Sequence, residues 1–232
     1  MILKHSQEPR CCSELTSFLK NCVDGVFILR LMVKLHTTTQ RNVNMRAIVL
    51  HGSPRRGGNS DTIATSFVKG LKEKGDVEII DFVLNDMDIT PCQGCESCMT
   101  SHDHKCVIDD DMHQIYSVFE DADVVVWATP MYWGYMSAQM KIALDRMEAL
   151  AMDPEKYWVD KEFVAILTYR HHYQSTVGFF ERVQDYFRFK LNVLSVCTMD
   201  TESREDFLIS SKPEMLKEAY QLGIKLGSAH RN

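Results

Sequence analysis

Four cysteines that lie close together are the residues of this chain best suited to do chemistry: Cys92, Cys95, Cys98 and Cys106. Two residues separate each of the first three, and seven residues separate the third from the fourth. Three thiolates at this spacing, with a fourth nearby, can hold one cubic iron–sulfur cluster. A disulfide framework would spread its cysteines to close large loops, and a zinc ribbon would use two separated pairs. The crowding therefore favours an iron–sulfur cluster with these four ligands.

Two other uses of the same segment stay open. His102 and His104 lie between the third and fourth cysteines, so three cysteines and one histidine could bind zinc instead. Alternatively, the cysteines bind no metal and serve as free or redox-active thiols.

The overall composition limits the classes of partner. Apolar residues make up 45% and charged residues 25% of the 232 residues, as in an ordinary globular protein. The formal net charge of −6 argues against nucleic acid, because binding phosphates needs a surplus of Lys and Arg. The apolar stretch at residues 26–35 is short and contains Arg30 and Lys34, so we expect no membrane span. Cysteines without a pairing pattern, and no convincing secretory signal, indicate the cytoplasm.

The first part of the chain differs from the rest. Residues 1–44 show no clear pattern of elements, whereas Met45 opens an apolar run typical of a strand. Either Met45 is the native start and residues 1–44 are an upstream extension, or residues 13–35 form a helical arm that packs on the domain or on a second subunit. We expect the folded domain to span residues 45–228, with a cysteine-rich insertion at 91–107.

From residue 45 onward, strand and helix patterns alternate. Short runs rich in Val and Ile predict five strands, at residues 47–50, 77–84, 124–128, 163–167 and 193–197. Apolar stripes with helical spacing predict helices over residues 63–71, 112–119, 136–147, 179–187 and 215–226. Five strand–helix units in succession predict an α/β fold. We expect a flavodoxin-like three-layer sandwich, with helices on both faces of a five-stranded parallel sheet of order 2-1-3-4-5.

The loop after the first predicted strand suits a phosphate group. Ligands of such sheets bind at the carboxyl ends of the strands, where the winding reverses between strands 1 and 3. Gly57 and Gly58 let the backbone bend close to a ligand, and the next helix offers free N–H groups to an anion. The candidate side-chain donors are Ser53, Arg55, Asn59, Ser60 and Thr62. Without the lysine of nucleoside-triphosphate loops, this loop fits a phosphate monoester such as that of FMN, or else a plain turn that caps the helix.

The loop after the third predicted strand faces the phosphate loop across the same crevice. It consists of Pro130, Met131, Tyr132, Trp133 and Gly134. Its two aromatic side chains could cover a flat heteroaromatic ring, and its backbone amides could hydrogen-bond the polar edge of that ring. The aromatic residues could also pack in a subunit interface, and both uses are compatible.

These motifs resemble a known family when they are taken together and in order. The phosphate loop, the cysteine segment, Asp109 with Asp110, the aromatic loop, residues 137–141, and Asp145 with Arg146 are similar to the NAD(P)H-dependent FMN reductase superfamily. Within it they resemble the iron–sulfur flavoproteins. The resemblance covers residues 45–228 in element order. Before the helix at 112–119, the aspartates 109–111 are expected to act as caps.

The resemblance implies the following site. FMN would place its phosphate on Ser53, Arg55, Asn59 and Ser60 and its ring system against residues 130–134. A [4Fe–4S] cluster would occupy the four cysteines. The resemblance also implies NAD(P)H as a possible donor and a homodimer or dimer-based tetramer.

The predicted function is that of an FMN-dependent oxidoreductase of the iron–sulfur flavoprotein type. Electrons would pass between a reduced donor, a [4Fe–4S] cluster and FMN to a small-molecule acceptor or a redox carrier protein. No acid–base side chain need be catalytic, because the cofactors supply the chemistry. Two alternatives are a cluster-free NAD(P)H-dependent FMN, quinone or azo reductase, and a non-catalytic flavodoxin-like electron carrier.

Overall fold

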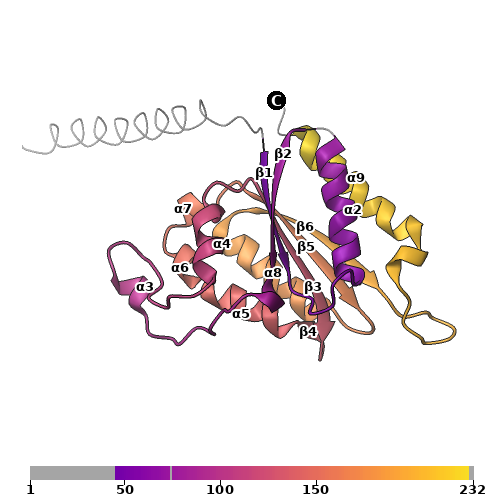
Figure 1. Ribbon diagram of the computed structural model, residues 1–232, viewed down its shortest axis with the longest axis horizontal. Coiled ribbons are helices and arrows are strands. Elements are labelled where there is room, and N and C mark those ends of the chain that lie inside the picture. The colour runs from indigo at the N-terminus through magenta and orange to yellow at the C-terminus, as the bar shows by residue number, and fades with distance from the viewer. Residues whose placement is uncertain (1–44, 74, 230–232) are drawn as a thin grey trace, which may run out of the picture. The chain divides into compact units, whose positions relative to one another are not determined.

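The computed structural model describes residues 45–73 and 75–229, so the expectations for residues 1–44 lie outside the described residues. In the described part, five parallel strands follow the order β2-β1-β3-β5-β6 (Figure 1). Their bounds are β1 (Met45–His51), β2 (Val77–Val83), β3 (Val124–Tyr132), β5 (Glu162–Tyr169) and β6 (Lys190–Cys197). The predicted order 2-1-3-4-5 is confirmed. A sixth strand of two residues, β4 (Tyr135–Met136), pairs antiparallel with the end of β3.

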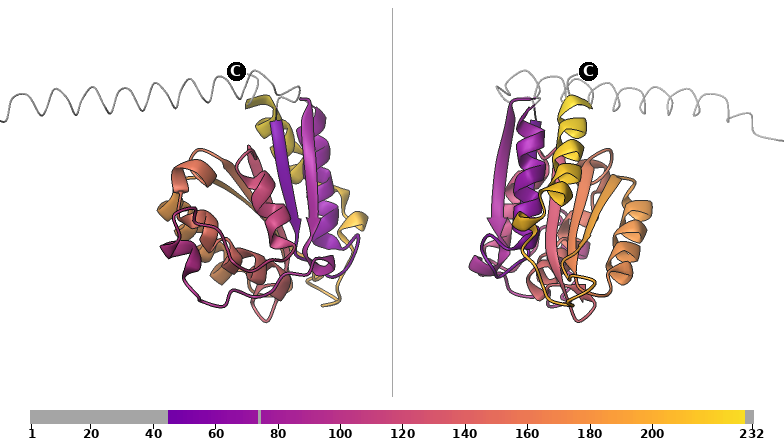
Figure 2. Two further views of the ribbon diagram at one scale, coloured as in Figure 1. Left: turned by 60° about the vertical axis from the view of Figure 1, so that its left-hand side comes forward. Right: turned by 90° about the vertical axis from the view of Figure 1, so that its right-hand side faces the viewer.

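Helices cover both faces of the sheet, as expected. One face carries α2 (Asn59–Glu73) and α9 (Pro213–Ala229), which lie side by side (Figure 2). The other face carries α4 (Met112–Phe119), α5 (Ala138–Arg146), α6 (Glu148–Ala151), α7 (Pro154–Tyr157) and α8 (Gln174–Phe187). The shorter elements are α3 (Ser97–Thr100) and the 3-10 turns η1 (Leu84–Asp86) and η2 (Ile209–Ser211). Among the described residues, no helix combines the length and the apolar character that crossing a bilayer requires.

The burial of the strands follows their place in the sheet. The central strands β1, β3 and β5 are covered on both faces, which explains their nearly continuous apolar sequences. The edge strands β2 and β6 are only partly buried along most of their length. Their sequences accordingly mix apolar and polar residues.

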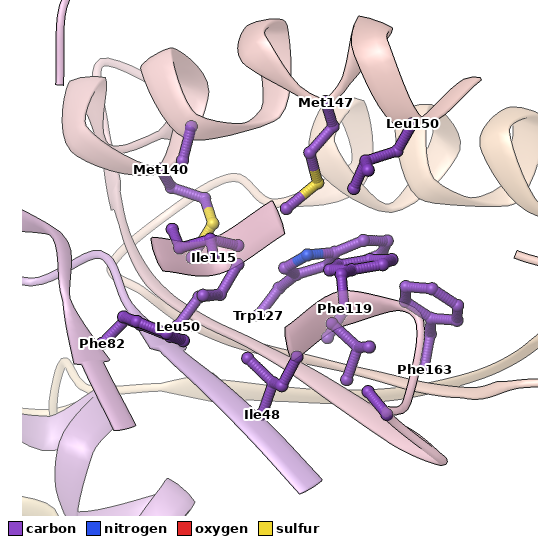
Figure 3. Packing of buried hydrophobic residues seen from close by; sticks show 14 of the residues in the cluster. Ile48, Leu50, Phe82, Ile115, Phe119, Trp127, Met140, Met147, Leu150 and Phe163 are labelled. Carbon is purple, nitrogen blue, oxygen red and sulfur yellow. The ribbon is translucent and has the colours of Figure 1, made fainter. Parts of the chain in front are cut away.

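The core beneath α5 is rich in aromatic and sulfur-containing side chains. Trp127 of β3 is fully buried and stacks on Phe180 of α8, with 4.7 Å between the ring centroids. Figure 3 shows Met140 and Met147 directed from the helix layer toward the sheet, on the side where Trp127 lies. This packing fixes α5 on the sheet. Its position matters because both ends of α5 support candidate sites.

On the other face, α2 and α9 approach each other at backbone distance. A Cβ atom on Gly223 would overlap the backbone oxygen of Phe67, and one on Gly70 would overlap that of Tyr220. Only glycine allows this contact, because any side chain at these positions would push the helices apart.

We predict that Gly223→Ala lowers the free energy of unfolding by about 1–3 kcal/mol, because the added methyl group meets rigid backbone. Urea denaturation measures the change. The control is Gly178→Ala in α8, where the nearest atom to the added Cβ is an Arg182 side-chain nitrogen at 3.5 Å. That variant should be unchanged or more stable by up to about 1 kcal/mol, because alanine favours helix. Equal stability of the two variants would contradict the close α2–α9 contact.

Candidate functional site

The four predicted cysteine ligands line a single hollow of about 320 Å³. The chain between η1 and α4 leaves the sheet in a long excursion that carries α3 (Figure 1). The junction of α5 and α6 also lines the hollow, through Arg146, Glu148 and Ala149. The structure thus brings together four residues that span fifteen positions of the sequence, from 92 to 106.

Two left-handed backbone positions bend the chain on either side of Cys95. Gly94 has a φ of +62° and Glu96 a φ of +58°. Glycine adopts such angles without steric cost, which suits Gly94 to the turn between the first two cysteines. These bends allow three closely spaced cysteines to line the same hollow.

The cysteines of the hollow differ in exposure and in proton affinity. Cys92 and Cys95 are exposed, Cys98 and Cys106 are half-buried, and all four are free thiols. Hydrogen bonds from the side chain and backbone of Ser97 lower the pKa of Cys95. Burial, and then the neighbouring Cys106, raise the pKa of Cys98. Ser97 therefore favours the thiolate of Cys95, which is the form that binds metals.

The donor set of the hollow fits an iron–sulfur cluster. Within residues 45–73 and 75–229, no three His, Cys, Asp or Glu side chains are grouped tightly enough to hold a single metal ion. His104, a candidate zinc ligand, has its Nδ1 at 2.9 Å from the carbonyl oxygen of Cys98. Four thiols around one hollow match the all-cysteine ligand set of a [4Fe–4S] cluster. Their role as ligands stays a prediction.

A buried ion pair closes the base of the cysteine segment. The Arg146 side chain is 1% exposed and that of Asp110 is 5% exposed. Their two hydrogen bonds measure 2.6 Å from Nη1 to Oδ2 and 3.1 Å from Nη2 to Oδ1. Burial alone would raise the pKa of Asp110, but the hydrogen bonds from Arg146 and from backbone N–H groups hold it below its ordinary value. The pair is therefore ionised in the folded protein.

The same pair fastens the two ends of the cysteine segment to each other. Arg146 Nη1 donates to the carbonyl oxygen of Thr90 at 2.7 Å, and the Thr90 N–H donates to Asp110 at 2.9 Å. Beside them, the Asp88 N–H donates to Asp111 Oδ2 at 2.8 Å. Asp110 also accepts from the N–H of Met112 at 3.1 Å, at the start of α4. The N-cap residue of α4 is Asp111, and its side chain makes no capping hydrogen bond, so the expected capping by these aspartates is confirmed only for the contact of Asp110. The contact between Asp110 and Arg146 was not predicted from the sequence. The feature that could have indicated it is the lone arginine within the apolar helix predicted at 136–147.

The loop predicted to bind phosphate is held in shape mainly by its own hydroxyl groups. Ser53 is buried, and its Oγ accepts from the Arg55 N–H at 3.1 Å. The Thr62 hydroxyl donates to the carbonyl oxygen of Gly58 at 3.0 Å, and Ser60 is buried in the first turn of α2. Both polar atoms of the Asn59 amide bind the backbone of residues 207–209, at 2.9 and 2.8 Å.

Two exposed arginines of this loop have different surroundings. Arg56 forms an ion pair with Asp86 of η1. Arg55 is exposed and takes part in no ion pair with another residue of the described chain. The arrangement leaves Arg55 and the N-terminus of α2 as the groups best placed to meet an anion.

His51, at the end of β1, connects the phosphate loop to the edge of the sheet. Its Nδ1 lies 3.1 Å from Asp61 of α2 and its Nε2 lies 3.0 Å from Asp81 of β2. Burial alone would lower the pKa of His51, but these two carboxylates raise it to about 9. Asp61 in turn accepts from the Gly57 N–H at 3.1 Å. A protonated His51 thus holds the carboxylate that supports the loop.

The predicted aromatic loop is a tight hairpin at the end of β3. Trp133 and Gly134 connect β3 to β4 with φ angles of +51° and +74°, as in a type I′ turn. The Trp133 side chain is fully exposed, and Tyr132 is 41% exposed. Both rings are thus open to a ligand or a partner, as either interpretation of this loop requires.

Ser137 joins the two loops of the crevice and begins α5. Its Oγ donates to the carbonyl oxygen of Gly52 at 2.6 Å and accepts from the Met140 N–H at 3.2 Å as the helix cap. Its N–H donates to Thr129 Oγ of β3 at 3.0 Å. Helix α5 therefore connects the crevice, through its N-cap Ser137, to the cysteine hollow, through its last residue Arg146. With nine residues in α5, these two ends lie about 14 Å apart along the helix axis.

Comparisons with known proteins agree with this architecture. Residues 45–183 match the family model described as NADPH-dependent FMN reductase. The chain is 34% identical over 106 residues to an iron–sulfur flavoprotein of Methanocaldococcus jannaschii, which covers 46% of this chain and 53% of the relative. It is 39% identical over 123 residues to an iron–sulfur flavoprotein of Archaeoglobus fulgidus, which covers 50% of this chain and 58% of the relative. The chain thus spans about half the length of the curated relatives it matches.

A solved structure shares the fold. The NAD(P)H:quinone oxidoreductase from Methanothermobacter marburgensis superposes with a TM-score of 0.58 at 17% identity. The match covers 78% of this chain and 96% of that one. At this identity the likeness shows the fold alone.

We predict that His51 makes stability depend on pH. The folded-state pKa of His51 is raised from 6.5 to about 9. The contribution of the protonated imidazole to the free energy of unfolding is therefore fully present below pH 6.5 and is lost as the pH rises through 9. The free energy of unfolding should fall by about 1–2 kcal/mol across this window, a value reduced for solvent screening.

Urea denaturation at several pH values measures this slope. His51→Gln keeps a hydrogen-bonding side chain but cannot be charged, so it should flatten the slope. The exposed His172 gives the control variant His172→Gln, which should keep it. Equal losses of stability in His51→Gln and the wild type over this range would contradict a protonated His51 that is paired with Asp61 and Asp81.

Proposed function

Because the chain belongs to the NADPH-dependent FMN reductase family, we propose that it is an FMN-dependent oxidoreductase of the iron–sulfur flavoprotein type. The observation that supports this most is the placement of two candidate cofactor sites at the two ends of α5. When bound, FMN would supply an exchange between two-electron and one-electron transfer, and a [4Fe–4S] cluster would supply one-electron transfer.

The chain's own residues would hold and orient the flavin. Arg55 and the N-terminus of α2 would bind the phosphate, while Ser53, Ser60 and Thr62 keep the loop in shape. The hairpin of residues 130–134 would flank the ring system. Ser137 would keep the starts of the two loops at a constant separation, because it is hydrogen-bonded to Gly52 and Thr129, the residues that directly precede them.

The cluster would bind to Cys92, Cys95, Cys98 and Cys106. Their common hollow supports this proposal, and so do the names of the two curated relatives described above. We further propose NAD(P)H as the donor and a small molecule or a redox carrier protein as the acceptor. The exposed Tyr132 and Trp133 would contribute to a homodimer or dimer-based tetramer.

We predict that Cys95→Ser removes iron and leaves FMN in place, because the thiolate would be a cluster ligand and its hollow adjoins the opposite end of α5 from the proposed flavin crevice. The measurement is the ratio of iron and acid-labile sulfide to FMN after purification without oxygen. The wild type should contain about four irons per FMN. Cys197→Ser, which changes a free cysteine outside the hollow, should match the wild type.

Two outcomes of the same assay would contradict the cluster proposal. Wild-type protein with FMN and no iron would favour the cluster-free FMN, quinone or azo reductase. Iron retained by Cys95→Ser would mean that this cysteine is not a ligand.

We also predict that Arg55→Ala weakens FMN binding about tenfold, because a charge-assisted hydrogen bond to the phosphate is lost. Arg56→Ala should have a smaller effect, since Arg56 pairs with Asp86. Fluorescence titration with FMN and with riboflavin separates phosphate binding from ring binding. Riboflavin, which lacks the phosphate, should bind both variants as it binds the wild type. An equal loss of affinity for both flavins would place Arg55 away from the phosphate.

A further inference from the structure

The cysteine segment has little packing of its own to hold it in place. Met99 and Val107, its large apolar side chains, are 51% and 65% exposed. Cys92, Gln93, Gly94, Cys95 and Glu96 are all exposed as well. Burial of apolar surface therefore does little to select one conformation of this segment. Its contacts with the rest of the domain must do so.

The contacts of Arg146 are concentrated at the two ends of that segment. Its guanidinium binds both carboxylate oxygens of Asp110, the carbonyl oxygen of Thr90 at 2.7 Å and that of Ile108 at 3.4 Å. Thr90 precedes the first cysteine by two positions, and Ile108 follows the last by two. The hydroxyl of Tyr116 donates to the Arg146 carbonyl oxygen at 2.5 Å and so fixes its backbone.

Arg146 also belongs to the wall of the hollow itself. Its Nε is buried and has no hydrogen-bond partner in the described part of the chain. A buried donor left unpaired costs about 1–3 kcal/mol. This cost is consistent with a side chain selected for the site rather than for stability.

We propose that Arg146 is the positioning residue of the cysteine hollow. Together with Asp110 it holds the two ends of the 91–107 segment together and keeps the four thiols around one hollow before any metal binds. The inference rests on the proposed function insofar as the gathered thiols would bind a cluster. The positioning itself can be tested without one.

A protease site inside the segment gives a direct test on metal-free, FMN-bound protein. Lys105 is the only lysine or arginine in residues 91–107, and it is exposed. Trypsin cleavage after Lys105, followed by mass spectrometry, therefore reports the opening of this segment alone. Arg146→Lys keeps the positive charge but lacks the planar guanidinium that binds three acceptor groups at once. Asp110→Asn keeps the shape of the side chain but loses its negative charge. Both should increase the cleavage rate at Lys105 about tenfold or more.

The matched control breaks a different ion pair of the same helix. Lys141 pairs with Asp145 at 2.5 Å on the exposed face of α5. Lys141→Gln should leave cleavage at Lys105 unchanged, because exposed pairs contribute little. After reconstitution with ferrous iron and sulfide, iron per FMN should match the wild type in Lys141→Gln and fall at least twofold in the two test variants.

The remaining outcomes would contradict either the positioning role of Arg146 or the cluster proposal. Cleavage at Lys105 at the wild-type rate in both test variants would overturn the positioning role. So would equal acceleration at sites throughout the domain, because the pair would then stabilise the whole fold. A wild type that takes up no iron would overturn the cluster proposal, while faster cleavage at Lys105 alone would still support the positioning role.

Discussion

The buried contact between Arg146 and Asp110 is the interaction on which the arrangement of the cysteine site depends. Removing two charges from water costs several kcal/mol for each, so such a pair is a weak source of stability compared with apolar packing. Here the cost is offset by two hydrogen bonds within the pair and by backbone carbonyl groups that the guanidinium also binds. The pair does what apolar packing cannot do for this segment, since it specifies where a mostly polar, exposed loop begins and ends.

Helix α5 links the cysteine segment to the crevice proposed to bind flavin. Met140 and Ala143 anchor it in the core that contains Trp127, while Ser137 and Arg146 fasten a loop at either end. Because one short helix supports both sites, their separation is set by the rise of that helix and not by the flexibility of a linker. A rigid support of this kind would suit the two proposed redox centres, which would exchange electrons over a constant distance.

Much of the fold could be predicted from the sequence because the central strands are buried on both faces. Their continuous apolar runs indicated β1, β3 and β5, and shorter runs rich in Val and Ile indicated the edge strands β2 and β6. The succession of five strand–helix units predicted the strand order, and the helical stripes predicted the five longer helices. Strand β4 and helices α6 and α7 were missed because two to four residues are too few to show a period. The four cysteines and the two crevice loops were recognisable from local spacing and composition.

The missed features depend on contacts between distant residues. His51 is a single histidine at the end of a strand, and its partners lie 10 and 30 positions away. Asn59 was predicted as a phosphate ligand, which stays a prediction; the contacts of its amide with the backbone of residues 207–209, about 150 positions along the chain, were not predicted. Arg146 meets Asp110 across 36 positions. Local patterns do not contain such pairings, because they arise only when the sheet and its helices assemble.

We propose that one chain holds a flavin and an iron–sulfur cluster at the two ends of α5. The decisive test is a reductive titration without oxygen, followed by visible and electron paramagnetic resonance spectroscopy. We expect uptake of about three electrons per chain, two bleaching the flavin and one producing the signal of a reduced cluster. Uptake of about two electrons with flavin bleaching alone, or protein that binds no FMN, would contradict it.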